Sequence, residues 1–142
     1  QERPRLENCI KKLGMEAFIT FPGLVKNIEE YYQRASVFVL SSYYEGFPNV
    51  LAEAMASGLA CISFKCRFGP SEMIRHEHNG LLVNDGDIEE LSRALFDLAQ
   101  DSLKRNIMGQ NASKEILNML SPDQVMSKWE ALVQECLQEG CS

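Results

Sequence analysis

Short apolar runs and helical repeats of apolar residues alternate along most of this chain. A short run without polar interruption, rich in β-branched residues, is typical of a strand that is buried on both faces of a parallel sheet. Several such runs occur, each bounded by polar or turn-forming residues. We predict four strands, over Ala17 to Phe21, Val37 to Leu40, Ala60 to Phe64 and Leu81 to Val83.

Segments with a helical repeat separate these strands. Strands and helices alternate without the turn residues of a hairpin, so successive strands are expected to run parallel and to be joined by right-handed crossovers. The predicted fold class is therefore α/β, with a doubly wound parallel sheet. Asn27 and Glu30 have the spacing of a capping box at the start of one helix. The short helices are expected over Arg5 to Leu13, Asn27 to Arg34, Val50 to Ser57 and Pro70 to Arg75.

The carboxyl-terminal tail is predicted to be entirely helical. Asp87 and Glu90 open one helix with an apolar face, and a second helix spans roughly Leu103 to Leu117. Ser121 to Gln124 form a capping box with proline at the first helical position, which starts a final helix. Trp129 lies on the apolar stripe of that helix, and we expect it to be a packing anchor.

The composition is that of a globular protein, and the charge excludes some functions. The chain has 142 residues, of which 45% are hydrophobic and 24% charged, enough for one domain with a core. Its net charge of -6 argues against a nucleic-acid-binding face and against a basic membrane-docking surface. No apolar run approaches the roughly 20 residues that span a bilayer, and the first residues do not resemble a signal peptide. We therefore expect a cytoplasmic protein.

The cysteines follow neither a metal-binding nor a disulfide pattern. Their number is odd, no two of them form Cys-x-x-Cys, and no histidine has the spacing of a zinc ligand relative to them. We predict reduced thiols that mostly lie in the core. The five residues are Cys9, Cys61, Cys66, Cys136 and Cys141.

A strand, a tight turn and a helix start follow one another between Val37 and Ser57. Pro48 suits the first helical turn because it has no N–H and a fixed φ, and Gly58 is well placed to end the helix. The free N–H groups at the helix start then point over the carboxyl end of the strand, where open α/β sheets bind ligands. Because these groups carry partial positive charge, we expect this corner to bind an anion such as phosphate.

Two carboxylates flank this corner. Glu45 lies just before the helix, and Glu53 lies inside it, eight positions later. Neither can be a phosphate ligand, because both are negatively charged. Carboxylates do accept hydrogen bonds from the hydroxyls of sugars and riboses. The combination of an anion site with two such acceptors suggests a sugar attached to a nucleoside diphosphate.

The run from Glu45 to Gly58 resembles the signature of the group 1 (family 4) retaining glycosyltransferases, whose two glutamates are separated by seven residues. The similarity continues in the same order over nearly the whole chain, and it is to the carboxyl-terminal domain of that family. The Phe-Pro-Asn-Val form is common among bacterial enzymes of capsule and lipopolysaccharide assembly, many of which use UDP-sugars. The other matching segments are Phe21 to Gly23, Ala35 to Leu40, Gly69 to Ile74, Asn79 to Val83 and the helix of Trp129.

The resemblance implies the Rossmann-like half of a GT-B enzyme that transfers a hexose, with retention, from a nucleoside-diphosphate sugar to a polysaccharide or lipid-linked acceptor. UDP is the expected nucleotide. In that family the equivalent of Glu45, the catalytic candidate, faces the donor sugar, and the equivalent of Glu53 holds the ribose hydroxyls. No metal or other cofactor is expected, because backbone amides offset the charge of the leaving diphosphate. The other donor-binding candidates are Gly46, Phe47, Asn49 and Val50 and, for the base, Gly23, Leu24 and Val25.

The family also places an arginine and a lysine on the diphosphate, and this sequence has no match to that segment. We therefore expect residues 1–142 to be a partial donor-binding domain, without its front and without the amino-terminal domain that binds the acceptor. Such a fragment is expected to be inactive alone and to self-associate through an unpaired sheet edge. The resemblance allows the full-length protein a peripheral position at the inner face of the membrane. Lys26, Lys65 and Arg67 do not match the motif, and we expect them to have surface roles.

Three other classes of protein share parts of this pattern. A non-catalytic flavodoxin-like or receiver-like module also alternates strands and helices, but it needs an acidic phosphoacceptor at the end of a strand, where this chain has Ser41 and Ser42. A dinucleotide-binding domain needs Gly-x-Gly-x-x-Gly after a strand, and this chain has none. A sugar-nucleotide epimerase or phosphorylase shares the two-domain architecture, and the spacing of the glutamates favours the transferase.

Overall fold

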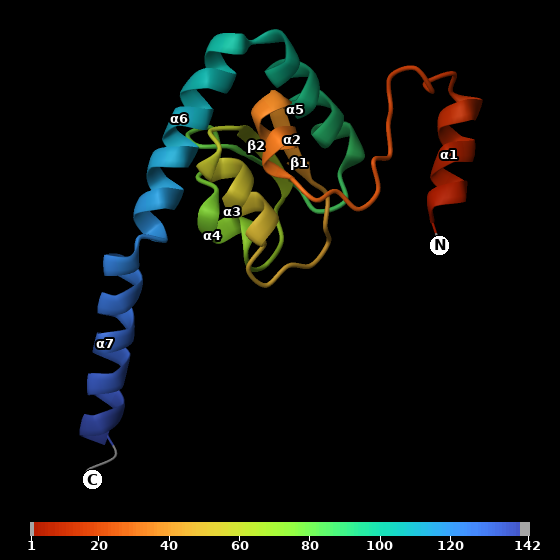
Figure 1. The fold of residues 1–142 in the computed structure, drawn as a ribbon. Coiled ribbons are helices and arrows are strands. Elements are labelled where there is room, and N and C mark those ends of the chain that lie inside the picture. The colour runs from red at the N-terminus through yellow and green to blue at the C-terminus, as the bar shows by residue number, and fades with distance from the viewer. Residues whose placement is uncertain (1, 140–142) are drawn as a thin grey trace.

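The computed structural model describes residues 2–139 of the chain. Three parallel strands form its centre, helices cover both faces of the sheet, and the first and last helices extend away from it (Figure 1). This arrangement confirms the predicted doubly wound α/β class with a helical tail. The elements are α1 (Arg3–Lys12), α2 (Glu29–Arg34), β1 (Val37–Leu40), α3 (Asn49–Ala56), β2 (Ala60–Phe64), α4 (Pro70–Met73), β3 (Leu81–Val83), α5 (Ile88–Gln100), α6 (Ser102–Met119) and α7 (Pro122–Glu139).

The strands lie in the order β1-β2-β3, and both neighbouring pairs are parallel. Val37 lies opposite Ala60, and Ile62 lies opposite Leu81. Three of the four predicted strands are therefore confirmed at their predicted bounds. Because the strands are parallel, their carboxyl ends lie at one edge of the sheet, where ligands bind in this class of fold.

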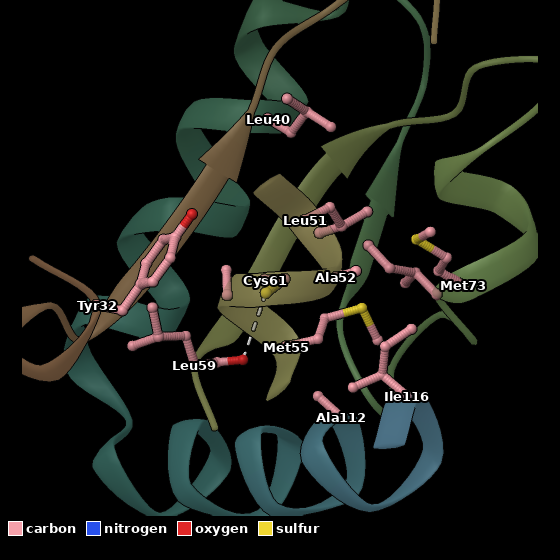
Figure 2. Packing of buried hydrophobic residues seen from close by; sticks show 12 residues of the cluster. Tyr32, Leu40, Leu51, Ala52, Met55, Leu59, Cys61, Met73, Ala112 and Ile116 are labelled. Atoms are coloured by element: carbon pink, nitrogen blue, oxygen red, sulfur yellow. Dashed lines mark hydrogen bonds between the residues drawn. The ribbon is translucent and has the colours of Figure 1, made fainter. Parts of the chain in front are cut away.

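Every residue of β2 is buried, and its side chains alternate between two hydrophobic cores. Cys61 belongs to the α3-side core, which Figure 2 shows, together with Leu51 and Met55 of α3. Ile62 points the other way and belongs to the α5-side core, together with Leu98 of α5. Burial on both faces explains why the sequence of β2 is a nearly continuous apolar run rather than an alternating one.

α6 contributes to both cores. Met108 belongs to the α5-side core, whereas Ala112 and Ile116, further along the helix, belong to the α3-side core. Gly109 allows the helix to lie against the turn after α3, because a Cβ at this position would overlap with the Gly58 carbonyl oxygen. α6 therefore joins the two layers of helices.

α3, the helix after the predicted site, lies within one residue of its predicted bounds at each end. It begins at Asn49, with Pro48 as its N-cap residue, and it ends at Ala56. Gly58 has a φ of 78°, a left-handed conformation that glycine adopts without steric cost. The proline and the glycine therefore fix where this helix starts and stops.

The predicted strand over Ala17 to Phe21 is wrong. The N–H groups of Phe18 and Ile19 both donate to the Met15 carbonyl oxygen, so the segment contains a turn and continues as irregular chain. A strand needs a neighbouring strand to pair with its N–H and C=O groups, and the sheet within residues 2–139 contains only β1, β2 and β3. Apolar character alone did not determine this conformation.

Two of the predicted helix caps form, and one does not. The side chains of Asp87 and Ser121 accept hydrogen bonds from the backbone N–H three residues later, at 2.8 and 3.3 Å. The predicted capping box at Asn27 is wrong, because Ile28 is the N-cap residue of α2. The side chain of Asn27 instead donates to the carboxylate of Glu30 (2.9 Å), so the two side chains satisfy each other rather than the backbone.

The apolar stripes of α1 and α7 are exposed. Trp129 is 60% exposed, so its predicted role as a packing anchor is wrong within residues 2–139. It lies on the apolar stripe as expected, but no element in the described part of the chain covers it. Further exposed apolar side chains at the two ends are Leu6, Leu13, Phe18, Leu24, Met126, Leu132, Val133 and Leu137.

The cysteines are also divided between the buried core and the exposed helices at the two ends. Cys61 and Cys66 are buried, whereas Cys9 and Cys136 lie exposed on α1 and α7, which contradicts the prediction that most lie in the core. Cys141 lies outside the described residues. No helix within residues 2–139 is both long and apolar enough to cross a membrane.

Candidate functional site

The loop after β2 lies directly against the turn after β1. The thiol of Cys66 donates to the Ser42 carbonyl oxygen (3.1 Å), which ties the two loops together. Gly69 has a φ of 75°, and a Cβ on it would lie 2.5 Å from the carbonyl oxygen of Gly46. Only glycine fits at position 69, for both conformational and steric reasons.

The loop after β3 meets the same turn, and the start of α4 is bonded to the loop after β2. A Cβ on Gly86 would lie 3.5 Å from ring carbon Cε1 of Tyr43, whose ring packs on Phe64 with centroids 5.8 Å apart. The hydroxyl of Ser71, in α4, donates to the Cys66 carbonyl oxygen (2.7 Å). The loops after all three strands therefore converge on the segment that the sequence singles out.

The turn between β1 and α3 presents free backbone amides. Pro48 has no N–H, and no side chain among residues 2–139 caps α3. The partial positive charge of the helix start is therefore not neutralised by a capping side chain. The amides predicted to bind the donor, those of Gly46, Phe47, Asn49 and Val50, have no backbone acceptor among residues 2–139.

Glu45 is half-buried in this turn, next to Gly69. Burial raises the pKa of the Cys66 thiol, and the negative charges of Asp85 and Glu45 raise it further. Glu45 therefore lies close enough to the loop after β2 to disfavour ionisation of the Cys66 thiol. The ion pairs formed within residues 2–139 do not include Glu45, so its carboxylate is available to a ligand.

Glu53 is exposed on α3, and its carboxylate has a partner that the sequence did not reveal. The hydroxyl of Tyr32, on α2, donates to Glu53 Oε2 at 3.1 Å. Burial, the hydrogen bond to Glu53 and the charge of Glu53 together raise the pKa of Tyr32 to about 12. No local motif could have identified this contact, because the two residues are 21 positions apart.

A cavity of about 280 Å³ lies between α3 and α6, next to Glu53. Phe47, Asn49 and Glu53 all line it, so the structure brings three of the predicted donor-binding residues to one cavity. Most of its wall is apolar, which suits a flat or hydrophobic group better than a phosphate. The remaining lining residues are Ala52, Ala56, Ile116, Leu117 and Leu120.

The residues predicted for base binding lie in the segment before α2. Gly23 has a φ of 72°, Leu24 is fully exposed, and Val25 is half-buried. No hydrogen bond within residues 2–139 joins this segment to the turn at Glu45. Their role in base binding stays a prediction.

Lys26, Lys65 and Arg67 are all exposed, as predicted. The structure adds that Lys65 and Arg67 belong to the loop after β2, at the same edge of the sheet as Glu45. The Arg67 guanidinium lies 5.2 Å from the centroid of the Phe68 ring. The strand order, rather than a motif, places these two residues at that edge of the sheet, and their position directly after a predicted strand was the signal for it.

Glu115, on α6, holds the segment between α4 and β3. Its Oε1 accepts from Arg75 Nη1 (2.8 Å) and lies 3.1 Å from His78 Nε2, and its Oε2 accepts from the buried Asn79 side chain (2.7 Å). His76 Nδ1 accepts a backbone N–H (3.1 Å). Both histidines therefore have structural partners. Within residues 2–139, no group of three or more histidine, cysteine or acidic side chains is arranged to hold a metal ion.

A comparison with known families shows which family the chain belongs to. Residues 1–115 match the family described as "Glycosyl transferases group 1". The chain belongs to this family. The resemblance drawn from Glu45 to Gly58 is thereby confirmed, and the signature of this group 1 glycosyltransferase spans the turn after β1 and the whole of α3.

Two relatives and one solved structure show the extent of the likeness. This chain is 35% identical over 132 residues to an exopolysaccharide phosphotransferase of Streptomyces coelicolor. The aligned residues cover 92% of this chain and 14% of that protein. It is 31% identical over 135 residues to an alpha-1,4-N-acetyl-D-galactosaminyltransferase of Campylobacter jejuni, covering 95% of the chain and 37% of that protein. Its fold matches HepE of Anabaena in complex with UDP with a TM-score of 0.85 at 22% identity, covering 93% of the chain and 36% of HepE. The chain therefore spans well under half the length of these proteins.

Proposed function

We propose that this chain is the donor-binding domain of a glycosyltransferase that moves a hexose from a UDP-sugar to a polysaccharide or lipid-linked acceptor, with retention and without a metal. One observation carries the proposal. The signature carboxylate Glu45 lies beside the free amides at the start of α3, where the loops after all three strands converge. Such a corner can hold an anion and a polyol next to each other.

The amides of Gly46 and Asn49 serve the diphosphate. Negative charge develops on the leaving nucleoside diphosphate as the bond to the sugar breaks, and donors already aimed at that position stabilise the charge without rearranging. The helix start of α3 supplies such donors. Lys65 and Arg67 add positive charge from the neighbouring loop.

Glu45 serves the sugar. A half-buried carboxylate accepts hydrogen bonds from sugar hydroxyls in the ground state. As the anomeric carbon becomes positively charged, the attraction between that carbon and the carboxylate increases. Glu45 therefore contributes more to the transition state than to substrate binding.

Glu53 serves the ribose, and the segment Gly23 to Val25 serves the base. The Campylobacter relative is named for a PP-undecaprenol-linked acceptor, which supports a lipid-linked acceptor here. The UDP complex of HepE supports UDP as the nucleotide. The chain spans 37% of the Campylobacter relative, so we propose that another domain of a longer cytoplasmic protein, at the inner face of the membrane, binds the acceptor.

The decisive experiment is Glu45→Gln in the full-length enzyme. The amide keeps the size and most hydrogen bonding of the carboxylate but removes its charge, so kcat should fall about 10-fold or more with little change in KM for the donor. Steady-state kinetics with UDP-sugars would measure both constants. Asp97→Asn is the matched control, because it makes the same carboxyl-to-amide change on an exposed residue near the end of α5.

An unaltered kcat for Glu45→Gln would refute the catalytic role of Glu45. Activity that EDTA abolishes and Mn²⁺ restores would refute metal independence. The anomeric configuration of the product, read by NMR, decides between retention and inversion.

A further inference from the structure

The hydroxyl of Tyr32 binds the carboxylate of Glu53, and the family signature does not include this residue. Tyr32 lies on α2, and its Oη donates to Glu53 Oε2 at 3.1 Å. A second acceptor, the Val50 carbonyl oxygen, is 3.4 Å away, too far to compete well for the single proton. Glu53 is therefore the main partner of this hydroxyl.

The ring of Tyr32 is held independently of its hydroxyl. The side chain is only 6% exposed and belongs to the α3-side core (Figure 2). Its ring meets the ring of Phe38 edge to face, with centroids 6.1 Å apart and planes at 71°. Packing alone thus fixes the ring, and the hydroxyl is presented to Glu53 from a defined position.

Glu53, by contrast, is an exposed side chain on a helix surface. A glutamate without a partner samples several rotamers and loses that freedom when a ligand orders it. The bond from Tyr32 restrains Oε2, and a carboxylate has roughly four acceptor positions in total. Oε1 makes no hydrogen bond within residues 2–139, so it remains available to a ligand.

We propose that Tyr32 is a positioning residue that holds Glu53 ready to accept hydrogen bonds from the ribose hydroxyls of the donor. This inference rests on the proposed role of Glu53 in nucleotide binding. The hydroxyl of Tyr32 is a neutral donor at physiological pH, and burial together with Glu53 raises its pKa further, to about 12. Ordering Glu53 in advance reduces the entropy lost on binding, so the hydroxyl of Tyr32 should matter only for ligands that carry ribose hydroxyls.

The test is a double-mutant cycle on the full-length protein, with UDP and 2′,3′-dideoxy-UDP as ligands. Affinities are measured by calorimetry for the wild type, Tyr32→Phe, Glu53→Ala and the double variant. Tyr32→Phe should weaken UDP about 3- to 10-fold and the dideoxy ligand less than about 2-fold. In the Glu53→Ala background, Tyr32→Phe should change UDP binding less than about 2-fold, because the group that it positions is gone.

Tyr31→Phe is the control, since Tyr31 is the neighbouring residue on α2 and is 46% exposed. It should leave both affinities unchanged. Suppose that Glu53→Ala weakens UDP binding but not binding of the dideoxy ligand, while Tyr32→Phe weakens the binding of both ligands equally. This result would overturn the positioning role of Tyr32 and leave the ribose role of Glu53 intact. Equal losses in Glu53→Ala would overturn the ribose role of Glu53, and the inference with it.

A second measurement, by NMR, can be made on the wild-type protein. The ¹³Cζ resonance of Tyr32 reports on its hydrogen bond, so UDP should shift it when the ribose hydroxyls reach Glu53, and the dideoxy ligand should not. The Tyr31 resonance is the internal control. A Tyr32 resonance that shifts equally with both ligands, or with neither, counts against the positioning role.

Discussion

The middle of the chain and its two ends have similar amphipathic sequences, but only the middle is packed. Between β1 and α6, the apolar side chains build two cores on either side of the sheet. Leu98 on α5 is completely buried, whereas Trp129 on the apolar stripe of α7 is 60% exposed. A repeat of apolar residues therefore specifies which face of a helix is apolar, and burial requires a second surface to cover that face.

The largest difference is expected for matched leucine substitutions. Leu98→Ala should lower the free energy of unfolding by about 2–5 kcal/mol, because it leaves a cavity in the α5-side core. Leu132→Ala, on α7 and 49% exposed, should change it by less than about 0.5 kcal/mol. Urea denaturation of both variants gives the comparison. A loss at Leu132 as large as that at Leu98 would show that a surface absent from residues 2–139 covers α7.

A smaller difference is expected for two cysteines in alkaline solution. Burial raises the pKa of the Cys61 thiol from 9.0 to about 12, so this thiol stays protonated in the folded protein and ionises on unfolding. The stability that the protonated Cys61 thiol contributes is complete below pH 9. It is lost as the pH rises from 9 towards 12, by up to about 1.4 kcal/mol for each pH unit. Cys61→Ala should flatten the decline of stability over this range.

The control for the pH series is Cys136→Ala, because Cys136 is exposed on α7. The decline of this variant should match that of the wild type. Stability measured by denaturation at several values between pH 8 and pH 11 tests both variants. Equal slopes for the wild type and Cys61→Ala would mean that the Cys61 thiol is not shielded from water in solution.

The smallest difference is expected for two helix caps. Asp101 is the N-cap residue of α6, and its side chain accepts the Lys104 N–H at 2.8 Å. Asp101→Ala should lower the free energy of unfolding by about 1 kcal/mol, because α6 is part of both cores. Ser121→Ala removes the cap of α7 and should cost less than about 0.5 kcal/mol, since fraying of an exposed helix is not coupled to the cores. The stability loss of each variant is measured by thermal unfolding. A larger loss for Ser121→Ala than for Asp101→Ala would contradict the view that the middle of the chain is packed and its ends are not.

The sequence predicts the fold well where a local signal and a partner coincide. The apolar run of β2 is buried on both faces, as such runs usually are, and Pro48 and Gly58 bound α3 because their backbone preferences act locally. Ala17 to Phe21 and Trp129 have equally clear apolar signals, but the described residues offer them no partner. Conformation and burial at those positions depend on contacts that a local pattern does not contain.

In the site, too, the sequence predicted the local features and missed the contacts between distant segments. The spacing of Glu45 and Glu53 could be read directly, because both belong to one continuous signature. The bond from Tyr32 to Glu53, and the approach of Gly69 to Gly46, join segments that are far apart in the chain. Such contacts depend on the order of the strands in the sheet. The sequence predicts the class of fold, but it does not fix that order.

The position of α6 across both cores also sets the order of events on the ribosome. Met55 is synthesised early, but Ile116, which packs in the same core, is synthesised about 60 residues later. At about 5–20 residues per second, the apolar face of α3 waits roughly 3 to 12 seconds for its cover. During that interval the nascent chain exposes apolar surface that favours aggregation, so a faster rate of translation through α5 and α6 should raise the yield of folded domain.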